Sequence, residues 1–408
     1  MLNLNVKEKG IELLKEGYVC DKCLGRNFAQ LLSGITDEER GRIIRNYIAM
    51  LIDSGEKISV DNSNFFEIKF HLKKIKTKKP KKCSICFGLF RELKKKAKLI
   101  VKKLEKYEYK TILVGCKLTP ELISKEDKIW NKVGIEWCES LKTQINRELG
   151  KEIAKLTRKD MNRKYPDITI MFDFNDESID LNIRSIYVYG RYQKLVRNIP
   201  QTKWKKKIYS TSVQEIIAKP FLIQAKSKES TFHGSGREDV NVRCLGWRPF
   251  ILEILEPKKR KLNLKEALRN VNKSKKIKVK NLKIVSKGLV RIIKSADYDK
   301  TYRAIVEFEK SVKNLKLIDN LRDSFILQKT PTRVIRRRSD KTRKRKVKNI
   351  KYKLLNKRKI ELKITTQAGL YVKELINGDD GRTEPSISSL LDNKVKNIEL
   401  DVIKIHCD

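Results

Sequence analysis

Two Cys-x-x-Cys pairs restrict how the N-terminal part of this chain can fold. The pairs are Cys20 with Cys23 and Cys83 with Cys86. Two thiolates at this spacing can bind one metal ion, and two such pairs complete the tetrahedral four-thiolate site that Zn²⁺ favours. Residues 24–82 separate the pairs, which is far more than the roughly 12 to 20 residues between the ligand pairs of common zinc fingers. We therefore expect a small module inserted between the ligands.

The composition of this candidate site favours a structural metal. Four protein ligands leave no open coordination position for water or substrate. Arg26 and neighbouring lysines can offset the negative charge of the thiolates. The alternative is that one pair is incidental or redox-active. The remaining cysteines are scattered and are expected to be packing residues: Cys116, Cys138, Cys244 and Cys407.

The chain is strongly basic. Its 408 residues carry 95 lysines and arginines against 50 aspartates and glutamates, a formal net charge of +45. This charge predicts a polyanionic partner, either nucleic acid or an anionic membrane. The sequence has no apolar run of about 18 residues, and its N-terminus lacks the apolar core of a signal peptide. We therefore expect a cytoplasmic protein that binds nucleic acid and no membrane. The alternative is that the whole proteome is basic, in which case the net charge says little about the binding partner.

Two segments combine basic residues with features that suit RNA. The densest basic run spans residues 333–348, where closely spaced like charges favour a phosphate backbone as the counter-charge. Residues 186–194 interleave tyrosines with Arg191 and Lys194, a pattern that suits base stacking and phosphate contact. The alternatives are a solvated charged loop for the first segment and an ordinary strand end for the second.

Composition and periodicity divide the chain into three zones. Residues 1–110 contain the cysteine pairs, residues 111–200 have the pattern of an α/β unit, and residues 205–408 are rich in strands with helices between them. An α+β fold with a mixed or antiparallel C-terminal sheet is the best match. Helices are expected at 11–16, 27–33, 40–52, 128–157, 212–221 and 264–270, and strands at 65–73, 109–114, 167–173, 179–189, 250–255, 279–285, 302–309, 359–365 and 399–406.

The segment His233–Arg243 contains the most informative carboxylate. Asp239 follows two glycines and lies between Arg237 and Arg243, which can keep it ionised at neutral pH. An ionised aspartate in a site that accepts a phosphodiester can act as a nucleophile or a general base. The simpler alternative is a loop aspartate that pairs with arginine for structural reasons.

The surrounding residues resemble a catalytic motif. Residues 233–250 read HGSGREDVNVRCLGWRPF, which is similar to the motif of the archaeal and eukaryotic tRNA pseudouridine synthases that act in the TψC arm. That family has an N-terminal THUMP-like RNA-binding region, and Asp239 matches its nucleophile. The chain departs from the family motif at Asn241, where a second acid is usual, and at Trp247, where a small residue is usual.

Further segments resemble the same family, in the family's order. Residues 190–204 resemble a family segment, which supports RNA contact there. Residues 328–338 resemble a Q-x-T-P-x-R-V-x-H-R-R segment, in which Arg336 replaces the histidine. The several motifs together are much more specific than any one of them.

Two tyrosines and a lysine also match family motifs. Tyr302 lies in the sequence KTYRA and by this resemblance would pack against the target base. Tyr371 and Lys373 lie in the sequence GLYVK, two positions apart in an expected extended segment, so that both can face one pocket. The resemblance implies that Lys373 pairs with Asp239. Without this resemblance, the simpler alternatives are that Tyr302 is a core residue of a strand and that Lys373 is an exposed, solvated side chain.

The resemblance implies two domains. Residues 1–200 would form a zinc-containing THUMP-like α/β accessory domain that binds RNA, and residues 205–408 a pseudouridine synthase domain with tRNA as partner. Uridine 55 would be the target, with uridine 54 as an additional candidate in archaea. The implied site has Asp239 as the catalytic residue, substrate contacts from Tyr302, Tyr371, Lys373, Arg237 and Arg243, and structural Zn²⁺ at Cys20, Cys23, Cys83 and Cys86.

The chemistry needs no organic cofactor, and the chain has neither a Walker A loop nor a G-x-G-x-x-G turn after a strand. Nothing in the sequence demands more than a monomer. The rival hypothesis is a non-catalytic, zinc-bearing RNA-binding or RNA-assembly protein. Charge and cysteines suit it equally well, but it has no need of Asp239. A THUMP-bearing methyltransferase is disfavoured because it would need a nucleotide-cofactor loop.

Overall fold

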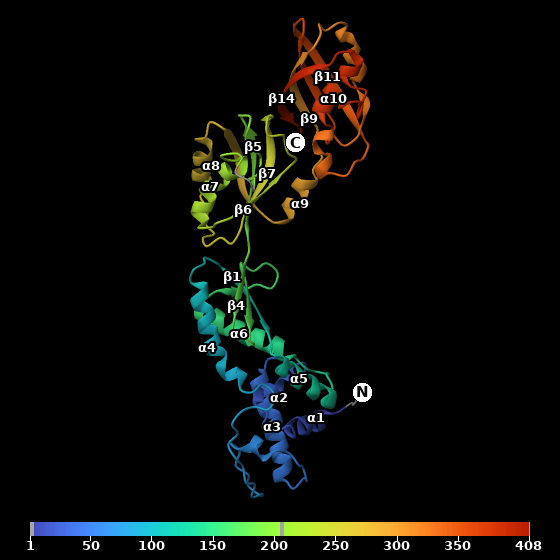
Figure 1. Ribbon diagram of the computed structural model, residues 1–408. Coiled ribbons are helices and arrows are strands. Elements are labelled where there is room, and N and C mark those ends of the chain that lie inside the picture. Colours follow the sequence, from blue (N-terminus) through green and yellow to red (C-terminus); the bar gives the residue numbers. More distant parts are fainter. Residues whose placement is uncertain (1–3, 205–207, 408) are drawn as a thin grey trace. The chain divides into compact units, whose positions relative to one another are not determined.

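The computed structural model describes residues 4–204 and 208–407. The chain divides into two compact units, unit 1 (Met1–Arg184) and unit 2 (Ser185–Asp408), whose elements are labelled in Figure 1. None of the described helices has the length and apolarity needed to cross a membrane.

The boundary between the units lies earlier than the sequence predicts. Periodicity assigns residues 186–194 to the first domain, but they form β5 (Ile186–Lys194), which pairs with β7 (Arg243–Ile254) and β8 (Ile277–Val285) of unit 2. The apolar pattern over 179–189 contains both the end strand of one sheet and the start of β5. Because strand periodicity is the same in both sheets, it cannot show where the chain leaves one sheet for the other.

Helices surround the cysteine pairs in unit 1. They are α1 (Val6–Leu14), α2 (Asp21–Arg26), α3 (Asp37–Asp53), the 3₁₀ helix η1 (Asn62–Phe65) and α4 (Leu89–Leu104). Capping boxes at Asn5 and Thr36 satisfy free backbone N–H groups where α1 and α3 begin. The backbones of α2 and α3 touch at Gly25 and Gly41, since a Cβ atom on Gly25 would lie 1.8 Å from the carbonyl oxygen of Asp37.

Two predicted elements in this region are wrong. Residues 27–33 form turns and bends, and α2 ends before them. Residues 65–73 contain no strand, although their apolar residues alternate. Ile68 and Phe70 of the alternating set instead pack against the core of unit 1, where Phe70 meets Phe65 edge to face with ring centroids 5.7 Å apart. The alternation thus marks residues that fill a core without pairing into a sheet.

The rest of unit 1 is an α/β layer. Its sheet has the order β2–β1–β3–β4, with parallel pairing of β1 to β2 and β3 and antiparallel pairing of β3 to β4. The strands are β1 (Thr111–Lys117), β2 (Asp160–Met161), β3 (Ile168–Asp173) and β4 (Ile179–Ile183). The helical run predicted at 128–157 is two helices, α5 (Pro120–Val133) and α6 (Leu141–Thr157), because the backbone has positive φ at Gly134 and Trp137.

Unit 2 contains a ten-stranded sheet in the order β13–β10–β11–β12–β9–β14–β7–β5–β8, with β6 paired to β7. Its pairs are antiparallel except for the parallel pair β14–β7, which confirms the predicted α+β class with a mixed sheet. The remaining strands are β6 (Ser230–Gly234), β9 (Lys300–Phe308), β10 (Ser324–Gln328), β11 (Arg343–Asn356), β12 (Lys359–Thr366), β13 (Thr383–Glu384) and β14 (Val395–Ile405).

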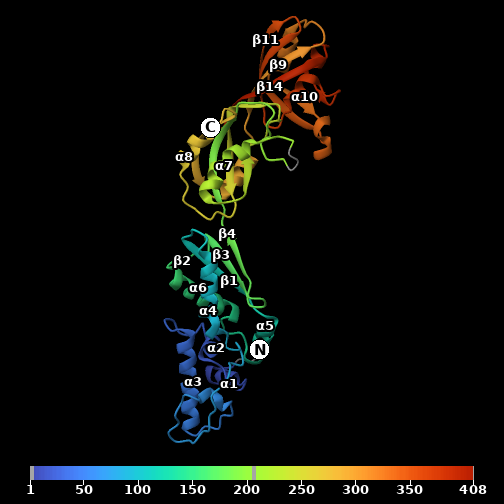
Figure 2. The same ribbon diagram turned by 60° about the vertical axis from the view of Figure 1, so that its left-hand side comes forward.

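Helices lie on both faces of the part of this sheet formed by β5, β7 and β8 (Figure 1). On one face, α7 (Val213–Ala225) and α8 (Leu264–Asn272) bury apolar residues against side chains such as Phe250. On the other face, α9 (Gly288–Ser295) packs Ile293 against Tyr187 and Ile251. Farther along the sheet, α10 (Val372–Asn377) lies beside β14 in both views (Figures 1 and 2), and α11 (Ile387–Leu390) follows it.

Candidate active site and metal centre

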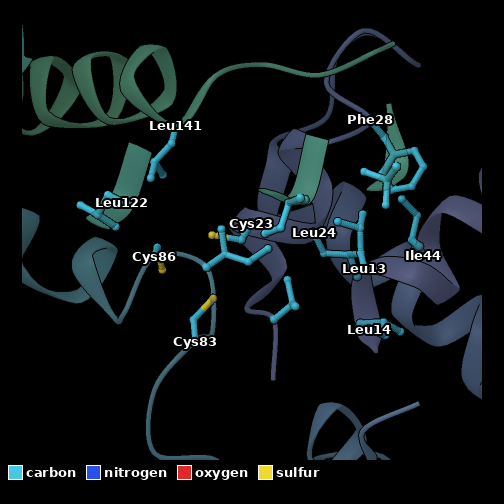
Figure 3. Packing of buried hydrophobic residues seen from close by; sticks show 14 of the residues in the cluster. Leu13, Leu14, Cys23, Leu24, Phe28, Ile44, Cys83, Cys86, Leu122 and Leu141 are labelled. Carbon is cyan, nitrogen blue, oxygen red and sulfur yellow. The ribbon is translucent and has the colours of Figure 1, made fainter. Parts of the chain in front are cut away.

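The four predicted metal ligands converge in unit 1. The Sγ atoms of Cys20, Cys23, Cys83 and Cys86 all lie within 4.8 Å of one another, and all four are free thiols. The backbone N–H of Cys20 also donates to Sγ of Cys83 at 3.3 Å. Figure 3 shows Cys23, Cys83 and Cys86 within the buried apolar cluster of this unit. The two pairs and the module between them therefore bring four sulfur ligands to one point.

A buried cation supports the fit of this donor set to a metal. The side chain of Arg26 is fully buried, and its Nη1 donates to Oε1 of Glu126 at 2.5 Å and to the carbonyl of Glu139 at 3.1 Å. Its Nε and Nη2 have no hydrogen-bond partner among the described residues, and Cys23 is one of the groups that act on it. Four thiolates around a divalent ion carry a net negative charge, which this guanidinium can offset. The residues present thus fit Zn²⁺.

Asp239 lies in unit 2 at a cavity of about 290 Å³. Lys373 approaches one carboxylate oxygen, with Nζ 3.1 Å from Oδ2. Arg333 approaches the other, and its Nη1 donates to Oδ1 at 3.0 Å. Lys373 also donates to Oδ1 of Asn241 at 3.0 Å. The amide at this position, where the resembled motif has a second acid, therefore helps to orient the lysine.

The pKa of Asp239 is held below its ordinary value. Partial burial would raise the pKa, but the positive charges of Arg333 and Lys373 and their hydrogen bonds outweigh this effect. The carboxylate is consequently ionised at neutral pH. One of these cations, Lys373, is the partner that the resemblance implies, whereas Arg333 takes the place expected of the neighbouring arginines. Arg243 binds Asp401 with N–O distances of 2.9 and 2.6 Å, and Arg237 lines the cavity without an ion pair to Asp239 among the described residues.

A buried polar cluster fixes the loop that carries Asp239. The carboxylate of the preceding residue, Glu238, is fully buried and lies 3.0 Å from Nε of Arg248. Tyr192 donates its hydroxyl hydrogen to Glu238 at 3.1 Å. Lys194 donates to the backbone carbonyls of Asp239 and Val240 at 3.0 and 3.1 Å. The loop is thus held through both its side chains and its backbone.

This cluster corrects one interpretation of the sequence. The tyrosines and basic residues of 186–194 were expected to suit RNA contact, yet Tyr192 and Lys194 are both 0% exposed. Alternation along β5 explains the result, because successive side chains point to opposite faces of the sheet. One half of the aromatic and basic pattern is therefore structural, and only the other half, which includes Tyr189 and Arg191, reaches solvent.

Two tyrosines line the same cavity as Asp239. Tyr302 extends from β9, and burial raises its pKa to about 12, against the opposing charge of Arg248. Its phenol is therefore neutral at physiological pH. The hydroxyl of Tyr371 accepts a hydrogen bond from Nη1 of Arg338 at 2.8 Å. Tyr371 and Lys373 share the cavity for a different reason than predicted, since Tyr371 is the N-cap of α10 and Lys373 lies in its first turn.

Arg333 and Glu374 are the site residues that the sequence did not assign. Nε of Arg333 donates to Oε1 of Glu374 at 2.6 Å, and the Glu374 side chain is only 4% exposed. Arg333 thus bridges Glu374 and Asp239. It stands in the basic run and in a resembled motif, but neither pattern identifies its partners. Lys300 also lines the cavity, where burial and the charge of Arg248 lower its pKa to about 8.

Comparison with known proteins gives consistent matches over both units. The family model described as Pus10, C-terminal, matches residues 187–406, and the model described as Pus10 THUMP domain, archaeal, matches residues 96–173. A relative from Pyrococcus furiosus named tRNA pseudouridine synthase Pus10 is 37% identical over 404 residues, covering 98% of each chain. Relatives of the same name from Methanocaldococcus jannaschii and Thermofilum pendens are 38% and 36% identical, each covering 98% of this chain and 95% of the relative.

Solved structures give more distant matches. A Cbf5-Nop10-Gar1 complex matches 53% of this chain and 48% of the matched chain, with 15% identity and a TM-score of 0.31. A pseudouridylate synthase matches 54% of this chain and 64% of its own, with 13% identity and a TM-score of 0.22.

Proposed function

Because this chain belongs to the Pus10 family of tRNA pseudouridine synthases, we propose that it isomerises uridine in the TψC arm of tRNA with Asp239 as the essential acid. The proposed target is uridine 55, with uridine 54 as a second site. The observation that carries the proposal is the ionised carboxylate of Asp239, which lies between Lys373 and Arg333 at a cavity lined by two tyrosines.

The reaction needs what this cavity supplies. Isomerisation breaks the bond between N1 and C1′ and forms one between C5 and C1′, while C5 loses a proton and N1 gains one. No atom is added and no electron is transferred, so no organic cofactor is consumed. A carboxylate can attack C1′, attack C6, or remove a proton in an elimination route. Each route requires the ionised form, which Lys373 and Arg333 maintain in Asp239.

The target base has to leave the RNA stack to reach this carboxylate. We assign the recognition of the everted base to Tyr302 and Tyr371, which offer aromatic rings at the cavity, and the contact with the adjoining phosphates to Arg237. Arg243 is assigned an indirect role, since its guanidinium is already bound to Asp401. The basic run over 333–348 supplies Arg333 and Arg338 to the cavity, which favours RNA contact for the run.

We assign Zn²⁺ to Cys20, Cys23, Cys83 and Cys86 on the basis of the four converging thiols and the buried Arg26. Bound there, the ion would hold the two pairs and the module between them together. With four protein ligands it would have no position for substrate, so its role is structural. Unit 1 is proposed to bind RNA, since it contains the segment that matches the THUMP model.

The deciding experiment compares the wild type with Asp239→Asn on an unmodified tRNA transcript, with pseudouridine detected by mass spectrometry. We expect kcat to fall by at least about 10⁴-fold, as when a residue essential to the chemistry is removed. The Kd for tRNA should stay within about twofold. Asp340→Asn is a matched control, because Asp340 also pairs with an arginine, Arg382, at 2.6 Å.

Turnover by Asp239→Asn near the wild-type rate would contradict the assignment of this residue. Transcripts with cytidine at position 55 or at position 54 identify the target, since only the substituted position loses its product. A wild-type protein that binds tRNA tightly but forms no pseudouridine would favour the rival hypothesis of a non-catalytic RNA-binding protein.

A further inference from the structure

Unit 2 has a second surface that the catalytic proposal does not use. Arg248 on β7 lines the cavity of Asp239, so the neighbouring side chain, Trp247, points to the opposite face of the sheet. On β5 the buried Tyr192 belongs to the core under α7 and α8, and Tyr189 and Arg191 point to the face that carries α9. The side chains of this face therefore lie across the sheet from the cavity.

Cations on this face lie over aromatic rings. Nζ of Lys280 is 4.4 Å from the ring centroid of Trp247, and Nζ of Lys283 is 5.1 Å from that of Tyr189. Nε of Arg191 donates to the hydroxyl of Tyr189 at 3.2 Å. Both lysines belong to β8, the edge strand of the sheet. Rings and positive charges are thus interleaved on one face.

Helix α9 and the residues just before it extend the positive surface. Lys287, Arg291 and Lys294 line a hollow of about 570 Å³. The one carboxylate in its lining, Glu253, is already bound, because Tyr187 donates to it at 2.8 Å and His233 lies 2.9 Å from it.

These cations lack a counter-charge. Within the described ranges 4–204 and 208–407, no carboxylate forms an ion pair with the five side chains Lys280, Lys283, Lys287, Arg291 and Lys294. A surface of this kind calls for an anionic ligand that can also contact aromatic rings.

We propose that the sheet face bearing Trp247, Tyr189, Lys280 and Lys283, together with the hollow beside α9, is a second RNA-binding surface. Phosphates would neutralise the lysines and arginines, and exposed bases would stack on the rings. The charge favours RNA over a protein partner, because the rings lie beneath cations and form no continuous apolar patch. Trp247 stands where the resembled motif has a small residue, so the ring proposed to stack here is one of this chain's departures from that motif.

This inference rests on the proposed function only in taking tRNA as the ligand. The surface and the cavity lie on opposite faces of one sheet. An RNA bound at both would have to pass around an edge of this sheet. We therefore expect the surface to hold a segment of tRNA outside the arm whose uridine enters the cavity.

The test measures the affinity of the full-length chain for an unmodified tRNA transcript and for an isolated TψC-arm hairpin over a range of salt concentrations. The variants are Lys280→Gln with Lys283→Gln, and Arg291→Gln with Lys294→Gln. Each pair should weaken tRNA binding about tenfold at 0.1 M salt and lower the magnitude of the slope of log K against log salt by roughly 1.5, while hairpin binding stays unchanged. The matched control is Lys359→Gln with Lys396→Gln, since both lysines pair with Glu307 at 3.4 and 3.6 Å.

A further pair of variants tests stacking separately from charge. Trp247→Gly should weaken tRNA binding about fivefold or more, and Trp247→Phe should restore most of the affinity because it keeps a ring. If the two double variants of lysine and arginine bind tRNA with the same affinity and salt slope as the control, the proposal is overturned. An acidic protein would then be the expected partner of this face.

The outcomes separate this inference from the catalytic one. A wild type that forms no pseudouridine, with weakened tRNA binding in the surface variants, would overturn the proposed function and support the surface. Pseudouridine formation in the wild type, with surface variants that bind tRNA like the control, would support the proposed function and overturn the surface.

Discussion

The cysteine cluster of unit 1 and the Asp239 site of unit 2 both gather ionisable groups, but in opposite environments. The cysteine cluster is largely buried, and the buried guanidinium of Arg26 can offset the negative charge that its thiols carry when they bind a metal. Asp239 is 37% exposed at its side chain, faces a cavity, and has two cationic partners. The first arrangement shields its charges from solvent and substrate, whereas the second presents an ionised group to a ligand.

This difference in exposure indicates which of the ionisable groups can react with a substrate. All four sulfur ligands are directed at one point, so a metal there satisfies every group and leaves none to react. At the second site the cations contact Asp239 from its sides, and the cavity leaves the carboxylate accessible. Substitutions in the first site should therefore act on stability, and substitutions in the second on turnover.

The largest effect that would test this contrast is expected from Cys83→Ser. Losing one ligand should weaken zinc binding and destabilise unit 1 by about 4 kcal/mol, which is the stabilisation provided by a ligand at roughly a thousandfold excess over its Kd. Hydrogen exchange would localise the loss to residues 4–184, and turnover by folded protein should change little. Cys116→Ser is the control, since Cys116 is buried in the same unit outside the cluster. Equal destabilisation by both variants would contradict a metal site.

A smaller effect is expected from Lys373→Met. Removing this charge-assisted hydrogen bond should lower kcat about 100-fold, comparable to the loss of one donor in other preorganised sites. The pKa of Asp239 is depressed, so activity is present above the folded pKa and is lost as pH falls through it. Without Lys373 that pKa rises, and the acid limb of the pH–kcat profile should move to higher pH. An unchanged limb would mean that Lys373 does not act through Asp239.

The smallest effect is expected from Glu374→Gln. Glu374 touches Arg333 and not the cavity, so it is a positioning residue whose loss should let Arg333 move away from Asp239. We expect kcat to fall about tenfold with little change in KM, because a small misplacement of a catalytic group slows the chemical step more than it weakens binding. Glu361→Gln removes the same kind of partner from Arg303 and should have no such effect. A change in KM alone would point to a structural role.

The fold class and much of the site could be predicted from the sequence. The alternating apolar residues of β3, β9, β12 and β14 are visible because each strand has one buried face, and the Cys-x-x-Cys spacing is a local property. Residues 65–73 show the limit, since Ile68 and Phe70 alternate like strand residues yet pack against a core without a partner strand. The same limit placed β5 in the wrong unit, because pairing partners are remote along the chain.

The sequence by itself determined the four thiols at Cys20, Cys23, Cys83 and Cys86, the presence of an acid at Asp239 and the excess of positive charge. These are properties of residue identity and short spacing. Only the tertiary structure decided that Arg333, and not the neighbouring arginines, joins Lys373 in ionising Asp239, and that Tyr192 is buried while Trp247 faces away from the cavity. The physical reason is that charges and rings act over a few ångströms in space, and sheet pairing sets those distances independently of separation along the chain.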